Sequence, residues 1–299
     1  MRTRLVAVYS AAHFTVDFTC AFVMLRVISG GSAHALCFLL YNFCAFAMQA
    51  PLGVLADRLN RNRLFATCGL LLTALAGALA FAPGLAIAAS ALLGIGNGAF
   101  HVGGGIDVMN FQKLGALGVF VSPGAFGIYL GALLGQGNAF PVLSALLLPF
   151  LAAIAVFVFC RDGVRNTPFS LSGLSLSRMT LAAGLFLAVC LRSYLGFAAD
   201  FPRAGAWGIV LVCAVAAGKA SGGFIAEKLG LPQTGIAAAL AAAALLLLPY
   251  HAAGIGAAFL INLTMPLTLG GMARLFPNAK GFAFGALTLA LFIGTLPVL

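Results

Sequence analysis

The sequence contains little charge and very little acid. Of its 299 residues only 6 are Asp or Glu and 16 are Lys or Arg, so 7% are charged, whereas about 25% is usual in a soluble domain. Hydrophobic residues make up 63% of the chain, and no soluble fold of this length has enough interior to bury so much apolar surface. The scarcity of charge therefore excludes a soluble globular protein.

Patterns that would indicate other classes of protein are also missing. The net charge of +10 does not indicate nucleic-acid binding, because almost all the bases lie in short gaps between apolar runs. The seven cysteines lie mostly within those runs without metal-like spacing, so we predict buried thiols rather than disulfides or zinc. No Ser-His-Asp spacing, His/Glu metal cluster or paired carboxylates on one helix is present. We expect no enzyme, no metal and no cofactor.

Apolar runs long enough to cross a bilayer recur along the chain. A spanning helix needs about 20 apolar residues. We predict eleven spans, at approximately 5–28, 34–56, 64–82, 85–109, 116–136, 141–160, 179–199, 206–226, 235–250, 253–272 and 282–299. The first is too long for a signal peptide and lacks its cleavage pattern. With the N-terminus in the cytoplasm, 12 of the 16 bases fall in cytoplasmic gaps, which fixes the orientation.

The longest gap, 161–178, separates six spans from five. We therefore predict an all-α membrane protein with an N-terminal six-helix bundle (1–160), a cytoplasmic linker (161–178) and a C-terminal bundle of five spans (179–299).

A short motif occurs once in each half, after the second and the eighth span. It consists of a glycine, an acid four residues later and a base directly after the acid, at a constant offset of 170 residues: Gly53, Asp57 and Arg58 in one copy, Gly223, Glu227 and Lys228 in the other. Two further pairs of segments show weaker similarity between the halves: 94–100 with 254–259, and 115–131 with 281–294. Such repeats indicate a duplicated membrane domain, with both halves entering from the same side. The second half then lacks a sixth helix, either by truncation or because the protein has eleven spans.

The first copy resembles the signature loop of the major facilitator superfamily, in which Arg61 and Arg63 also match, although Asn60 stands where that family usually has Gly. The resemblance implies two pseudo-symmetric helix bundles around a central cavity. It also implies a cytoplasmic gate held closed by these loops; the alternative is a solvated turn whose bases set the topology. The gate residues would be Gly53, Asp57, Arg58, Arg61, Gly223, Glu227 and Lys228.

Three patches are most similar to fosmidomycin-resistance-type exporters of that superfamily. They are 13–18, 94–105 with Phe100-His101, and Leu191-Arg192-Ser193-Tyr194. The family commonly has a proline after the histidine, where Val102 stands here, and is usually longer than 299 residues. The likeness implies proton-coupled export and makes Tyr194 a candidate site residue.

Charged side chains inside spans are costly, by about 2.5–3.5 kcal/mol at the bilayer centre, so each needs a reason. His13 and Asp17 are four residues apart and share one helix face. Arg192 is about as far into the seventh span as Asp17 is into the first. We predict that Asp17 and Arg192 face each other across the cavity and couple transport to protons. A fixed ion pair, or hydrogen bonds to nearby hydroxyls, is the alternative.

Three further polar residues lie within the spans. His101 lies among glycines in the fourth span, where it can relay protons or bind substrate, or instead bond a backbone exposed by its neighbours. Asp107 and Lys219 are secondary candidates that we place near the cytoplasmic ends of their spans. There Lys219 can snorkel to the headgroups, and Asp107 can serve in gating, at the helix end or in coupling.

We therefore expect a multi-pass inner-membrane transporter with alternating access. The expected activity is proton-driven efflux of a small amphipathic or weakly anionic compound by a monomer in the lipid bilayer, with no nucleic-acid partner. Uptake of a nutrient by the same fold, and a non-transporting sensor or assembly protein derived from it, are the alternatives.

Overall fold

The computed structural model describes residues 2–31, 33–137, 140–160, 169–171, 175–203 and 205–298. Within these ranges the secondary structure is entirely helical. The helices are α1 (Arg2–Val23), α2 (His34–Asn42), α3 (Gln49–Leu59), α4 (Asn62–Leu79), α5 (Ala86–Met109), α6 (Leu114–Val121), α7 (Pro123–Gln136), α8 (Val142–Phe159), α9 (Leu176–Ala198), α10 (Ala206–Leu229), α11 (Leu231–Leu246), α12 (His251–Leu275) and α13 (Lys280–Thr295).

The predicted spans correspond closely to these helices. Ten segments of the described chain are long and apolar enough to cross a membrane. The predicted ninth span, 235–250, is instead the shorter apolar helix α11, displaced by four residues to Leu231–Leu246. Most of the predicted linker, 161–168 and 172–174, lies outside the described residues.

Two of the spans are broken helices. The second is formed by α2, a π-helical turn at Phe43–Ala47 and α3, and the fifth is formed by α6 and α7. The fifth breaks at Ser122, since the following Pro123 has no N–H to continue the helix. The Ser122 hydroxyl donates instead to the Ala216 carbonyl of α10 at 2.8 Å. The break therefore ties one half of the protein to the other.

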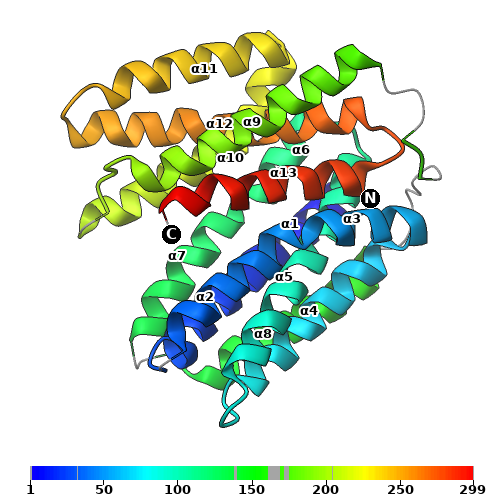
Figure 1. Cartoon of the computed structure of the whole chain (residues 1–299), viewed down its shortest axis with the longest axis vertical. Coiled ribbons are helices and arrows are strands. Elements are labelled where there is room, and N and C mark those ends of the chain that lie inside the picture. The colour runs from blue at the N-terminus through cyan, green and yellow to red at the C-terminus, as the bar shows by residue number, and fades with distance from the viewer. Residues whose placement is uncertain are drawn as a thin grey trace.

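The helices form two bundles, as Figure 1 shows, with the N-terminal helices α1–α5, α7 and α8 in the lower part and α9, α11 and α12 in the upper part. Two seams join the bundles. In one, α3 packs on α13, which lies along the boundary in Figure 1, and in the other α6 packs on α10. The seams are equivalent in the two repeats, because α3 and α10 each carry one copy of the duplicated motif.

Both seams lie toward the same end of the molecule. Helix α13 packs chiefly on α3, the half of the second span that ends at the Asp57 turn, rather than on α2. Likewise α10 packs more on α6 than on α7. The residues Leu36 and Leu39 of α2 are exposed. The bundles therefore meet at the end that the distribution of bases assigns to the cytoplasm, which we call the cytoplasmic end.

Candidate functional site

A buried polar cluster links α1 to α5 in the middle of the N-terminal bundle. The His13 Nε2 atom lies 3.2 Å from Asp17 Oδ2 and 2.9 Å from His101 Nε2. The His101 Nε2 atom lies 3.7 Å from the second carboxylate oxygen, Oδ1, to which the Asn97 amide donates at 3.0 Å. Two predicted residues of one helix and one of another thus meet, because α5 packs beside α1 and brings His101 opposite the His13–Asp17 face.

The hydrogen bonds assign the protons of the two imidazoles. The His101 Nδ1 atom lies 2.8 Å from the Asn97 carbonyl oxygen, which only accepts, so Nδ1 carries the proton and Nε2 is a bare acceptor. The His13 Nε2–H therefore donates toward His101 and Asp17. The other nitrogen, His13 Nδ1, is buried without a partner among the described residues. The one proton on His13 Nε2 thus faces two acceptors, Asp17 Oδ2 and His101 Nε2.

Apolar groups enclose this cluster. The rings of Phe120 and Phe100 pack on His13, with centroid distances of 4.9 and 6.1 Å. Gly124 of α7 covers the pair closely, because a Cβ there would lie only 2.5 Å from Asp17 Oδ2. Water is thereby kept from most of the cluster, and its electrostatic interactions are strengthened.

One base of the C-terminal bundle, Lys219, acts on the cluster and on a second base, Arg192. The Lys219 ammonium of α10 interacts electrostatically with the Asp17 carboxylate and with Arg192, as well as with His101. Lys219 is half-buried and forms no hydrogen bond or ion pair with another described residue. One bundle therefore supplies the acid and the imidazoles, and the other supplies two bases that form no ion pair with any described residue.

Lys219 lies farther from the cytoplasmic end of its span than the sequence indicated. It lies ten residues before Leu229, the last residue of α10. That places its Cα about 15 Å from the helix end, half the thickness of a hydrocarbon core of about 30 Å. Because Cα–Cβ bonds in a helix tilt toward its N-terminus, snorkelling to the cytoplasmic headgroups is disfavoured at this depth.

Asp17 and Arg192 are not joined directly by any hydrogen bond or ion pair of the described residues. The guanidinium Nη1 of Arg192 instead donates to the hydroxyls of Thr268 and Thr264, at 3.2 and 3.4 Å. A guanidinium has five N–H donors, so these two long bonds leave most of its capacity unused. Lys219 is the residue that interacts with both.

The remaining candidates inside the spans lie apart from the cluster. Tyr194 follows Arg192 by two residues, about 200° around α9, and it is exposed. Asp107 accepts from the Tyr9 hydroxyl at 2.7 Å and from the Asn62 amide at 2.8 Å. It thus ties the cytoplasmic end of α5 to α1 and α4.

The duplicated motif forms the second candidate site, at the cytoplasmic seams. The Asp57 carboxylate accepts from the backbone N–H groups of Gly281 and Phe282, both at 2.8 Å, at the start of α13. The Glu227 carboxylate accepts from the Gly115 N–H at 3.2 Å, at the start of α6. The first N–H groups of a helix lack internal partners and carry a partial positive charge. Each acid therefore holds a helix of the opposite bundle.

The motif glycines make this contact possible. A Cβ on Gly53 would overlap the Gly281 backbone, and one on Gly223 would overlap the Leu114 backbone. The motif bases take other positions. Arg58 lies 5.4 Å over the Phe169 ring, while Arg61 and Lys228 are exposed.

The same central cluster is the group of described residues that could hold a metal ion. One ligand atom each from His13, Asp17 and His101 lies within 4.8 Å of the others. Imidazole nitrogen and carboxylate oxygen suit first-row transition metals. The Asn97 carbonyl, which accepts a hydrogen bond from His101 Nδ1–H, would fix the orientation of that imidazole toward the ion.

Sequence reasoning missed Asn97 and Gly124 as site residues. Asn97 precedes His101 by four residues in a glycine-rich span, so an amide on the histidine face of a membrane helix was the available signal. Gly124 gave no comparable signal, because only its packing across α1 distinguishes it from other glycines.

No protein-family model and no curated protein matches the chain. Solved structures do. The chain is similar to a major facilitator superfamily transporter, FucP, in the outward conformation (TM-score 0.69, 13% identity, 98% of this chain and 89% of that chain covered). It is also similar to a variant of the E. coli fucose:proton symporter FucP (TM-score 0.71, 13% identity, 98% of this chain and 89% of that chain covered). A third similar structure is that of a bacterial homologue of the iron transporter ferroportin in the outward-facing state (TM-score 0.64, 16% identity, 99% of this chain and 90% of that chain covered). The chain therefore has the fold of major facilitator superfamily transporters and is a multi-pass membrane protein.

Proposed function

We propose that the protein is a secondary active transporter that exports a small amphipathic or weakly anionic compound in exchange for protons. It would work as a monomer in the inner membrane. The observation that carries the proposal is the division of charge between the bundles. Asp17, His13 and His101 lie in one bundle, and the bases Lys219 and Arg192 lie in the other.

This arrangement couples proton binding to substrate binding. While Asp17 is ionised, it attracts Lys219 across the boundary between the bundles. When the Asp17 cluster gains a proton, this attraction weakens and the two bases become available to an anionic group. Proton and anion thus act on the same interaction, which couples their binding. Because the proton favours the anion, this interaction alone has the sign of cotransport, and the exchange in the proposal rests on the likeness to exporters and on the flux test below.

The motif contacts support an alternating-access cycle. Because Asp57 and Glu227 hold α13 and α6 at the cytoplasmic end, the conformation described is closed there. A FucP structure and the ferroportin homologue, to which the chain is similar, are both titled as outward structures. Export follows when these contacts release and the cytoplasmic end opens.

Efflux and proton coupling are supported by two likenesses. The patches around His13, His101 and Arg192 resemble fosmidomycin-resistance-type exporters. One neighbour in fold is titled a fucose:proton symporter, which supports proton coupling. A symporter, however, moves its substrate in the same direction as the proton, whereas the proposed exchange moves the two in opposite directions. The sign of proton movement therefore decides between export and uptake.

The test is proton flux in proteoliposomes that hold the purified chain, with a library of weakly anionic compounds. We expect compound-dependent proton movement that Asp17→Asn abolishes. The matched control is Asp200→Asn, since Asp200 is an exposed acid between α9 and α10. Proton movement antiparallel to the compound supports export, and parallel movement supports uptake. Flux that survives in Asp17→Asn, or is absent with every compound, contradicts the proposal.

Transport of a divalent transition metal is the second candidate, favoured by the convergence of His13, Asp17 and His101. A neighbour titled as a homologue of an iron transporter lends it support. Calorimetric titration of the purified chain with Zn²⁺, Mn²⁺ or Co²⁺ tests it. Saturable binding lost in both His13→Gln and His101→Gln, with flux of the ion in liposomes, would favour the metal over the organic anion. Absence of binding would remove this candidate.

A further inference from the structure

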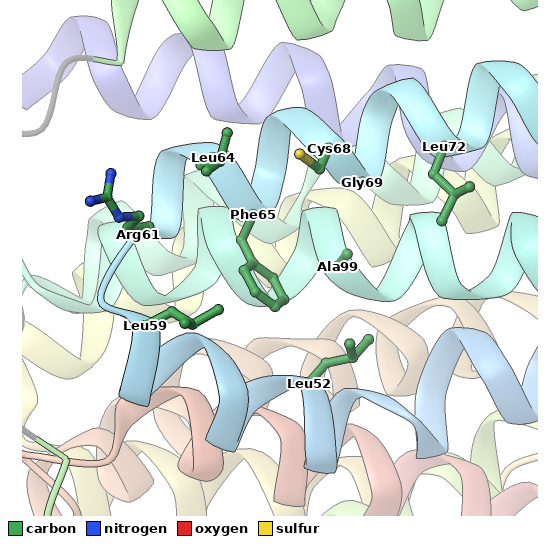
Figure 2. Close-up of a pocket in the computed structure, with 9 residues that line it drawn as sticks. All are labelled: Leu52, Leu59, Arg61, Leu64, Phe65, Cys68, Gly69, Leu72 and Ala99. Carbon is green, nitrogen blue, oxygen red and sulfur yellow. The ribbon is translucent and has the colours of Figure 1, made fainter.

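An apolar groove runs along the outside of the N-terminal bundle, between α3 and α4. It has a volume of about 280 Å³, and Figure 2 shows Leu52 and Leu59 on one wall and residues of α4 on the other. Arg61 lies at one end, and Leu72 lies at the other. The lining residues are Leu52, Leu59, Arg61, Leu64, Phe65, Cys68, Gly69, Leu72 and Ala99.

The groove exists because two consecutive helices turn away from each other. Helix α3 packs on α13 and α5, whereas α4 packs on α5 and α8, and α3 and α4 make little contact. Their separation leaves α5 as the floor, where Ala99 offers only a methyl group. At Gly69, α4 lies so close to α5 that a Cβ added there would be 2.6 Å from the Gly96 carbonyl oxygen. The groove is thus a fixed feature of the bundle's packing.

Its length matches one leaflet of the bilayer. Arg61 and Leu72 are eleven residues apart, a rise of about 16 Å along α4. Half of a hydrocarbon core of about 30 Å is about 15 Å. Arg61, in the turn before α4, therefore lies at the level of the cytoplasmic headgroups, and Leu72 lies near the midplane.

Of the three arginines in and beside the turn between α3 and α4, Arg61 has a side chain that stacks on no aromatic ring of the described residues. Arg58 stacks on Phe169, and Arg63 stacks on Phe157 at 5.0 Å. The Arg61 side chain is exposed and forms no hydrogen bond or ion pair with another described residue. An anionic group at the headgroup level would meet no competing acid there, since Asp57 is turned to the N–H groups of α13.

We propose that this groove binds an anionic phospholipid of the cytoplasmic leaflet, with one acyl chain between α3 and α4 and the phosphate on Arg61. Basic pockets between membrane helices on the cytoplasmic side are suited to such headgroups, and each buried methylene of the chain adds hydrophobic stabilisation. The bound chain braces α3, which carries Gly53 and Asp57 of the seam. The proposal is independent of what the protein transports.

The test measures lipid binding to the delipidated full chain in detergent by native mass spectrometry and thermal unfolding. The probes are dioleoyl phosphatidylglycerol and dioleoyl phosphatidylcholine. We expect tighter binding and a larger rise in the unfolding midpoint with phosphatidylglycerol. Arg61→Gln should weaken phosphatidylglycerol binding about fivefold and remove the preference for it. The matched control Arg274→Gln changes another cytoplasmic base, in the last turn of α12, and should leave both unchanged.

A second variant and a second probe separate the groove from general surface charge. Ala99→Leu fills the floor and should weaken binding of both lipids, whatever their headgroup. Inorganic phosphate should produce no rise in the midpoint, because it has no acyl chain. Equal loss in Arg61→Gln and Arg274→Gln, full binding by Ala99→Leu, or a midpoint raised by phosphate alone would overturn the proposal.

Discussion

At the residue scale, a base inside the membrane without an acid partner lowers the stability of the protein. A position that keeps such a base therefore serves function rather than stability. Lys219 is such a residue, half-buried in mid-helix and acting on Asp17 and Arg192 only at a distance. A charge there costs free energy that an apolar side chain of similar length would not.

We therefore predict that Lys219→Met raises the thermal unfolding midpoint and lowers substrate-dependent proton flux. Removal of the charge should contribute about 1–3 kcal/mol to stability. Unfolding in detergent and flux in liposomes are measured on the same preparation, with Lys219→Arg as the variant that retains charge and flux. A lower midpoint in Lys219→Met would mean that Lys219 is a structural residue.

Gly124 provides a second prediction at this scale. Any side chain there meets His13 and Asp17, so Gly124→Ala should displace the pair, destabilise the protein by about 1–3 kcal/mol and reduce flux. Gly184 of α9 is the matched control, because no atom of the described residues, beyond its own helical turns, lies within 4 Å of a Cβ placed on it. Gly184→Ala should be neutral or stabilising, since Ala favours a helix. Equal effects of the two changes would contradict the close packing over Asp17.

At the element scale, the two seams should differ in strength. Asp57 accepts two N–H bonds at 2.8 Å, whereas Glu227 accepts one at 3.2 Å. Loss of a helix-capping carboxylate costs about 0.5–2 kcal/mol. We predict that Asp57→Asn opens the cytoplasmic end more than Glu227→Gln does.

Alkylation of a cysteine introduced at Ala279, which is fully buried just before α13, measures that opening. In a background without the seven native cysteines, its rate should rise most in Asp57→Asn and least in the Asp200→Asn control. A rate unchanged by Asp57→Asn would show that the helix contacts do not hold this end closed.

The helices could be predicted from the sequence because a membrane-spanning helix is marked by a continuous apolar run of neighbouring residues. Apolar runs located ten spans as the structure has them, and i,i+4 spacing placed His13 beside Asp17. The partners of that pair were not predictable in the same way. Asn97, His101 and Gly124 reach it through the packing of α5 and α7 on α1. The depth of Lys219 was misjudged because α10 continues to Leu229, past the predicted end of the eighth span at 226.

At the scale of the whole molecule, the two bundles can be equivalent only if α11 crosses the membrane. Its 16 residues rise about 24 Å, less than a hydrocarbon core of about 30 Å. Local thinning of the bilayer accommodates such a helix at modest cost. The bases also require the crossing, because Lys228 before α11 and Arg274 at the end of α12 both belong on the cytoplasmic side.

We therefore predict opposite accessibility at the two ends of α11. In a cysteine-free background, Gln233→Cys should react with a membrane-impermeant maleimide only from the cytoplasmic side. Tyr250→Cys, at an exposed position in the loop after α11, should react only from the other side. Right-side-out and inverted vesicles supply the two sides. If both cysteines reacted from one side, α11 would lie in the interface, the orientation of α12 and α13 would reverse, and Asp57 could not reach the α13 N-terminus from the cytoplasmic face.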